Sequence, residues 1–299
     1  MKNYTRLTLL AAIPVLCAPV YAATTGSAFL KIAPGAREQG MANAVTAAGG
    51  SLQSLYANPA GMATVEGTEA AVSHVELAQE NKLENITFGH AAFGGRLAYG
   101  LTYVHYGDLD GRDLTGAQTG SFAAYDAALQ LAYARNFGNL SVGGALKAVR
   151  NKIETECGDG FGFDAGAIYN FEKFKLGAAI VNAGKSGKVG ALYENLPATA
   201  AIGAATTIKT VTVSADYKRN LPENRTTLAA GAEAKLIPLF TIRAGYSRDI
   251  TNKDTVPSDN LLGLSAGFGL ALGKLTLDYA YTSQGELGNN HRFTLGAKF

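Results

Sequence analysis

An alternation of apolar and polar residues recurs along the chain from about residue 68 to the last residue, and it constrains the fold more than any other feature. The segments 126–136, 210–220, 239–249 and 274–284 all show it, and the second of them reads TVTVSADYKRN. Period-two alternation gives a strand one apolar and one polar face. Strands of about ten residues with this pattern, separated by turn residues, are typical of a transmembrane β-barrel. The sequence therefore predicts an all-β fold, an antiparallel membrane barrel.

The connections between the alternating segments are long and short in turn. Long connections are expected at 106–120, 182–197 and 249–259, whereas those at 93–95 and 137–139 are short. Outer-membrane barrels have short periplasmic turns and longer external loops, and a soluble two-sheet sandwich has no reason to produce this series. Because the series begins and ends with a long connection, the first strand begins and the last strand ends on the short-turn side. This requires an even number of strands, and we count about fourteen.

The polar faces of these strands carry charged residues that the alternation directs into the barrel lumen. Acidic and basic side chains are mixed among them. Because charges in such a lumen need partners or water to offset their desolvation, we interpret them as a pairing network that fills the interior. The alternative is a conduction path or a ligand site with fixed charge. The predicted lumen charges are Asp126, Lys147, Asp164, Asp216, Glu233, Arg243, Asp278, Arg292 and Lys298.

The chain ends inside an alternating segment, HRFTLGAKF at 291–299. We expect this segment to be the closing strand, with Phe293, Leu295, Ala297 and Phe299 facing lipid. A C-terminal aromatic residue preceded by alternating apolar residues resembles the signal read by the bacterial outer-membrane assembly machinery. The resemblance implies two partners, the lipid of the outer membrane and the barrel assembly machinery, with Phe293, Leu295 and Phe299 as the assembly signal.

The first 22 residues have the features of a secretory signal peptide. Lys2 and Arg6 precede an apolar stretch at 7–20, and residues 20–22 form a small-x-small cleavage site. Export together with the barrel pattern predicts a location in the outer membrane of a Gram-negative-type bacterium. The signal holds two of the 26 basic residues and none of the 24 acidic ones, so the remainder is balanced in charge and indicates no nucleic-acid partner.

Residues 23–67 do not alternate. They are rich in Ala and Gly, and a short helix is expected near 36–47. Eight-stranded barrels fill themselves with side chains, whereas much wider ones hold water or a plug. We therefore expect three parts: a signal peptide at 1–22, a hatch segment at 23–67 inside the barrel, and the barrel itself at 68–299.

Two stretches of the hatch segment, SAFLKIAPGAREQGM and SLYANPAGMA, resemble the N-terminal region of the PorV/PorQ proteins, which are relatives of the FadL-type outer-membrane transporters. The resemblance implies that Asn58, Pro59 and Ala60 form a motif within the hatch. This motif is either a turn that closes the hatch, because Pro presets φ and Asn favours turns, or part of a ligand site. The chain departs from the family at Ala28, where Gly is usual, and in its modest loops.

The resemblance leaves two functions open. In the first, which the LKIAPGAR match favours, the protein is a plugged docking component of a type IX secretion-like system and binds an exported cargo protein. In the second, it is a FadL-like transporter for small hydrophobic molecules. A standard interface needs about 800 Å² per partner, and the compact loops offer little such surface. We favour docking slightly over hydrophobic uptake.

The sequence does not indicate an enzyme, a cofactor or a metal site. His105 lies near Asp108, Asp110 and Asp113. The other histidines are scattered, however, and no Ser-centred elbow accompanies them. The Gly-x-Gly at 158–166 opens a strand and is no nucleotide-binding loop. The Asp-rich stretch at 106–113 lacks the twelve-residue spacing of a calcium loop.

Overall fold

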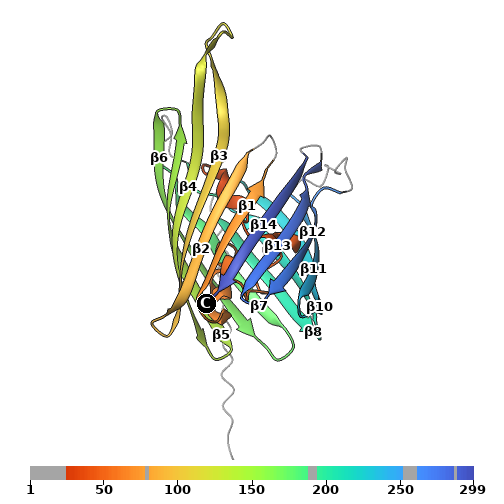
Figure 1. Cartoon of the computed structure of the whole chain (residues 1–299). Coiled ribbons are helices and arrows are strands. Elements are labelled where there is room, and N and C mark those ends of the chain that lie inside the picture. Colours follow the sequence, from red (N-terminus) through yellow and green to blue (C-terminus); the bar gives the residue numbers. More distant parts are fainter. Residues whose placement is uncertain (1–24, 78–80, 188–193, 252–260, 286–287) are drawn as a thin grey trace, which may run out of the picture.

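The computed structural model describes residues 25–77, 81–187, 194–251, 261–285 and 288–299. The predicted signal peptide at 1–22 lies outside these residues. Fourteen antiparallel strands close into one barrel in which each strand pairs with its neighbours in the sequence and β14 pairs with β1 (Figure 1), which confirms the predicted fold. The strands are β1 (Glu69–Glu76), β2 (Lys82–Ala92), β3 (Gly95–Arg112), β4 (Gln118–Phe137), β5 (Leu140–Ile153), β6 (Glu156–Asn170), β7 (Lys175–Lys185), β8 (Thr199–Ile208), β9 (Val211–Asn220), β10 (Arg225–Ile237), β11 (Phe240–Asp249), β12 (Leu264–Leu272), β13 (Leu275–Ser283) and β14 (Asn289–Lys298).

The seam between β1 and β14 closes the barrel. Val72 lies opposite Leu295 and His74 opposite Phe293. Leu295 is 53% exposed and Phe299 72% exposed on the outer surface. The backbone N–H of Phe299 donates a hydrogen bond to the carbonyl oxygen of Thr68 at 2.8 Å, so pairing continues to the last residue. The apolar side of the closing strand therefore faces outward.

The hairpin turns are sorted by length between the two ends of the barrel. The C-terminus and the short turns lie at one end, and the longer connections lie at the other (Figure 1). The short turns include 93–94, 138–139 and 209–210. We refer to these as the short-turn end and the loop end of the barrel.

The predicted loop at 106–120 is wrong in its bounds, because most of it is strand. β3 and β4 continue as a paired hairpin that projects beyond the other strands at the loop end (Figure 1), and only residues 113–117 connect them. The Gly- and Asp-rich sequence resembles a turn. The pairing instead shifts its register between His105 and Asp108, where Gly107 adopts a φ of +72°, and the two strands remain paired beyond this irregularity. The predicted loops at 182–197 and 249–259 fall partly outside the described residues.

The two faces of the strands differ in the way that the alternation requires. On β9, Val213 and Tyr217 lie exposed on the outer face, whereas Ser214 and Asp216 are buried on the inner face. A lipid-facing wall explains an outer surface with so many exposed large apolar side chains. In the described part of the chain, no helix has the length and the apolar character needed to cross a membrane.

An arginine on the outer face should therefore be far more damaging than one on the inner face. Leu131 lies outward on β4, six residues from the short-turn end of the strand, and is 45% exposed. This places it near the middle of an apolar band about 25 Å tall, and we expect Leu131→Arg to destabilise the barrel by about 2–4 kcal/mol, the penalty for a cation at the bilayer midplane. Thr212→Arg, on the inner face of β9 beside a cavity, should be tolerated. Urea titration of the lipid-reconstituted protein, read by the gel mobility of the folded form, measures both, and equal losses would show that the assigned faces are wrong.

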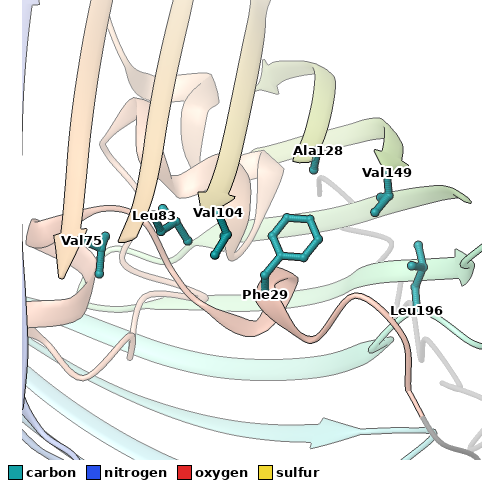
Figure 2. Close-up of a cluster of buried hydrophobic side chains, with 7 residues drawn as sticks. All are labelled: Phe29, Val75, Leu83, Val104, Ala128, Val149 and Leu196. Atoms are coloured by element: carbon teal, nitrogen blue, oxygen red, sulfur yellow. The ribbon is translucent and has the colours of Figure 1, made fainter. Parts of the chain in front are cut away.

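The hatch segment folds inside the barrel as η1 (Ala28–Lys31), α1 (Ala36–Gly40), η2 (Leu52–Tyr56) and η3 (Pro59–Thr64). Figure 2 shows Phe29 of η1 among apolar side chains of the wall, including Val75, Leu83 and Val104. Deeper in the barrel, Leu52 and Leu55 pack with wall alanines. The interior is thus a core shared by hatch and wall, and burial of its apolar surface holds the hatch in place.

Helix α1 is shorter than the predicted helix at 36–47. It ends at Gly40, and Ala42 and Asn43 adopt left-handed conformations with φ of 52° and 57°. The chain turns there because it lies directly against the wall: a Cβ on Gly40 would approach the Cβ of Arg243 to 3.2 Å. The helix therefore ends where the chain meets the barrel wall, at a glycine that fits this close approach.

Candidate functional site

A cavity of about 760 Å³ lies between the hatch and the loop end of the barrel. Its hatch side includes Phe29 and Ile32, and its wall side includes Val104 and Tyr106, so part of its surface is apolar. The remainder is rich in cations. The basic side chains that line it are Lys31, Lys218, Arg225 and Arg292.

Arg292 is the cation of this cavity that lacks an acidic partner. Its side chain comes from β14 and is buried; Nε donates to the carbonyl oxygen of Ala33 at 3.1 Å and Nη1 to Thr282 Oγ1 at 3.4 Å. Within the described residues, no carboxylate lies at ion-pair distance from it. A buried guanidinium with only neutral partners keeps an unbalanced charge, which an anion entering the cavity can neutralise.

The other cations of the cavity are paired. Lys31 of η1 forms an ion pair with Glu223 at 2.7 Å, and Arg225 forms one with Asp249 at 2.6 Å. Burial by itself raises the pKa of the Glu223 carboxyl, but hydrogen bonds from Lys31 and Thr25 outweigh burial and hold the pKa below its usual value. Lys218 donates to the carbonyl oxygen of Asn43 and lies 3.5 Å from a carboxylate oxygen of Asp216.

The hatch is tied to the wall by a chain of four charges. Arg37 of α1 donates two hydrogen bonds to the Glu233 carboxylate, both at 3.0 Å. Arg243 donates to the same carboxylate at 2.6 Å and to Asp278 at 2.6 Å. Arg37 also donates to the carbonyl oxygen of Gly49 at 3.0 Å, so it fixes a second part of the hatch. This bidentate contact is the main polar link between α1 and β10.

A second charged group lies inside the wall of β5, β6 and β7. Lys147 and Asp164 form an ion pair at 2.9 Å whose side chains are 3% and 0% exposed. Asp164 also accepts from Gln130 at 2.8 Å and from the backbone N–H of Asn182 at 2.6 Å. Asn182 lies in a left-handed conformation where the β6–β7 register shifts, and its amide donates to the carbonyl oxygen of Leu30 in the hatch at 3.2 Å.

The remaining predicted lumen charges are held separately. Asp216 accepts from the backbone and the hydroxyl of Thr46 in the hatch, at 3.0 and 2.7 Å. Asp126 accepts from Tyr106 and Asn151, each at 2.6 Å, and so has neutral partners. Lys298 lies exposed at the end of β14, without an ion pair in the described part of the chain. The structure thus divides these residues into several local groups, and Asp126, Arg292 and Lys298 form no ion pair among the described residues.

The Asn-Pro-Ala motif acts as the cap of a hatch helix. Asn58 is fully buried, and its Oδ1 accepts from the backbone N–H of Ala60 at the start of η3, with Pro59 in the first helical position. Its Nδ2 donates to the carbonyl oxygen of Thr46 at 2.7 Å and to that of Ala167 in β6 at 3.3 Å. These bonds use both ends of the amide to join two hatch turns to the wall, which fits the turn interpretation of the motif.

Glycines on the inner faces of the strands lie directly against the hatch, although they belong to no recognisable motif. A Cβ on Gly231 would lie 2.5 Å from the carbonyl oxygen of Met41, and one on Gly245 would lie 2.4 Å from its carbonyl carbon. On β7, a Cβ on Gly177 would lie 2.3 Å from the carbonyl oxygen of Thr46. These contacts are to backbone, which cannot move aside as a flexible side chain can. Glycine at a lumen-facing strand position is the sequence signal that locates such a contact.

A smaller cavity of about 320 Å³ lies on the opposite side of α1, toward the short-turn end. Arg37, Gly49 and Gly50 line it from the hatch, and Phe171 and Phe174 line it from the β6–β7 turn. The two cavities share no lining residue. Gln39 of α1 lines the first cavity and Arg37 of α1 lines the second, so helix α1 lies between them.

Asp113, at the end of the Asp-rich stretch that follows His105, holds the tip of the β3–β4 hairpin. Asp113 Oδ1 accepts from the hydroxyl and backbone of Thr115 and from the backbone of Ala117, which closes the tip of the β3–β4 hairpin. These hydrogen bonds lower the pKa of the Asp113 carboxyl. Within the described residues, no three His, Cys, Asp or Glu side chains are grouped so that they could hold a metal ion.

A closed fourteen-stranded barrel with an internal N-terminal hatch has the fold of the FadL-type barrels. The toluene transporter TbuX of Ralstonia pickettii superposes with a TM-score of 0.62 at 16% identity, covering 89% of this chain and 98% of that one. The toluene transporter TodX of Pseudomonas putida gives 0.60 at 15% identity over 87% and 95% of the two chains. A FadL homologue of Pseudomonas aeruginosa gives 0.58 at 14% identity over 88% and 97%.

The sequence itself has one family match. Residues 21–160 match the model of an uncharacterised protein family, UPF0164. This match spans the hatch and the first strands of the barrel. No curated protein matches the chain significantly.

Proposed function

We propose that this protein is an outer-membrane transporter for small hydrophobic molecules that carry an anionic group. The observation that carries the proposal is the cavity of about 760 Å³ at the loop end, where an apolar surface lies beside the unpaired guanidinium of Arg292. Ligand pockets of this size range combine mostly apolar walls with a few placed polar groups. The similarity in fold to two toluene transporters supports passage of hydrophobic molecules through such a barrel.

In this proposal the molecule enters from the loop end, packs its apolar part against Phe29 and Val104, and pairs its anionic group with Arg292. Passage onward requires α1 to move away from β10. Arg37 then exchanges its bond to Glu233 for water or for the passing anion, and the smaller cavity beside Phe171 receives the molecule. The hatch works as a gate that the balanced charges of the wall keep closed at rest.

The test is the affinity for a fluorescent medium-chain carboxylate and for the corresponding alcohol, both titrated into the detergent-solubilised protein. We expect Arg292→Gln to weaken binding of the carboxylate roughly 10- to 150-fold, the effect of losing a charged hydrogen bond, while binding of the alcohol changes little. Arg150→Gln is the matched control, because Arg150 is paired with Asp159 on the outer wall. Equal affinity of both ligands for the wild-type protein would refute the anionic preference, and no saturable binding of either would refute the transporter.

One observation favours docking as a second function. The β3–β4 hairpin projects beyond the barrel (Figure 1) and carries exposed apolar side chains at Leu109 and Leu114, the latter fully exposed. A PorV/PorQ-like component would use such a surface to bind an exported protein. Affinity purification from outer membranes separates the functions. An exported protein that is retained by the full chain and lost when residues 108–121 are deleted favours docking, and a bound hydrophobic molecule without a protein partner favours transport.

A further inference from the structure

A shallow groove of about 910 Å³ crosses the outer wall between β7 and β11. Its floor is formed by outward-facing alanines on neighbouring strands: Ala204 lies opposite Ala215, and Ala215 lies opposite Ala230. Larger side chains border it, among them Tyr217 and Leu228. On a surface that otherwise carries large apolar residues, a row of alanines leaves room for a narrow apolar chain.

Two arginines lie on the same outer face at the loop end of this groove. Arg248 of β11 lines the groove, and Arg219 of β9 lies two residues beyond Tyr217 and so faces the same way. Arg219 donates only to neutral groups, to Thr226 at 3.3 Å and to the side chain of Asn224.

No acid balances these arginines among the described residues. Neither Arg219 nor Arg248 forms an ion pair, and no outward-facing strand position from β7 to β12 is acidic. Asp216 borders the groove, but its carboxylate points inward and accepts from Thr46. The guanidinium groups are therefore free to bind an external anion.

Outward-facing charges elsewhere on the barrel provide the contrast. There the outward-facing Arg150 donates two hydrogen bonds to Asp159, at 2.6 and 2.8 Å, and His74 lies 2.6 Å from Glu84. Arg219 and Arg248, beside the groove, have no such acidic partner in the described part of the chain.

The height of the arginines fits a lipid headgroup. Arg219 lies eight residues from the start of β9 at the short-turn end. That is about 27 Å along the strand, or about 20 Å along the barrel axis at the usual tilt, which brings the side chain near the outer edge of an apolar band about 25 Å tall. Arg248 lies two strands from Arg219 and level with Tyr217, two residues short of Arg219, so the two Cα atoms are about 12 Å apart.

We propose that the groove binds a lipid with a phosphorylated headgroup in the outer leaflet. One acyl chain lies on the alanine floor, and phosphate groups accept hydrogen bonds from Arg219 and Arg248, whose planar guanidinium groups match phosphate geometry. The spacing of the two arginines suits a headgroup that carries two phosphates. The site would fix the orientation and surroundings of the barrel in the membrane. It rests on the proposed outer-membrane location but not on transport.

The test uses lipid A with two phosphates and its monophosphorylated form, each added to the full chain in mild detergent and counted by native mass spectrometry. We expect tighter binding of the diphosphorylated lipid, and Arg219→Gln with Arg248→Gln should weaken it at least about tenfold. Ala215→Phe should fill the floor and weaken both lipids, whereas Arg150→Gln should change neither. Heat-dependent gel mobility checks that each variant is folded.

Two results would overturn the site. The first is equal binding of both lipids by the wild-type protein. The second is a loss in Arg150→Gln as large as that in the double variant, because it would show unspecific attraction to surface charge. Binding of the carboxylate ligand in the inner cavity is measured in parallel. If only lipid binding fails, the groove site is wrong and the proposed transport stands; if only carboxylate binding fails, the reverse holds.

Discussion

Replacing Asp164 by alanine is expected to lower the free energy of unfolding by about 3–5 kcal/mol, because the substitution leaves the buried ammonium of Lys147 without a counter-charge. The pair is fully enclosed, with side-chain exposures of 3% and 0%. It also organises its surroundings, since Asp164 accepts from Gln130 and from the backbone of Asn182. Urea titration of the lipid-reconstituted barrel measures the loss.

Two controls make this prediction specific. Lys147→Met combined with Asp164→Leu removes both charges together and should restore most of the stability, as replacement of a buried pair by apolar residues often does. Arg150→Ala breaks an ion pair between the same two strands, but on the exposed outer face, and should have little effect. If Asp164→Ala is no worse than Arg150→Ala, the buried pair does not hold the interior together.

The sequence predicts the barrel well because the alternation is enforced by two different solvents. Lipid outside and a polar lumen inside fix the face of every second residue, so the closing strand at 291–299 and the inward phase of residues such as Asp216 and Arg243 follow from local pattern alone. The extended β3–β4 hairpin cannot be predicted from the same pattern. Above the membrane both faces of these strands meet water, and a glycine there does not mark a turn.

The partners of the lumen charges could not be predicted in the same way. Glu233 pairs with Arg37 of the hatch, a residue 196 positions away, and only the folded position of α1 brings them together. Asp164 meets Asn182 through a register shift that no alternation encodes. Arg292 has no acidic partner because the hatch leaves a cavity beside it. The position of this cavity depends on packing and not on sequence spacing.

Gly245→Val is expected to displace the hatch and open the barrel. The new side chain would begin 2.4 Å from the carbonyl carbon of Met41 and 2.5 Å from the backbone nitrogen of Ala42, and neither atom can move without shifting the turn that follows α1. Overpacking of this kind costs typically 1–3 kcal/mol, which raises the ratio of displaced to seated hatch roughly 5- to 150-fold. The wild-type protein should conduct little in planar bilayers, and the variant should show frequent openings.

Gly144→Val is the matched control for this change. Gly144 lies on β5, and a Cβ there would meet only the carbonyl oxygen of Asp164, at 3.5 Å, an ordinary contact. Its conductance should remain that of the wild type, while deletion of residues 23–67 gives the level of an unplugged barrel. Because Gly245 contacts the hatch backbone and Gly144 does not, a closed Gly245→Val variant that is correctly folded would mean that the segment between α1 and η2 is not what blocks the lumen.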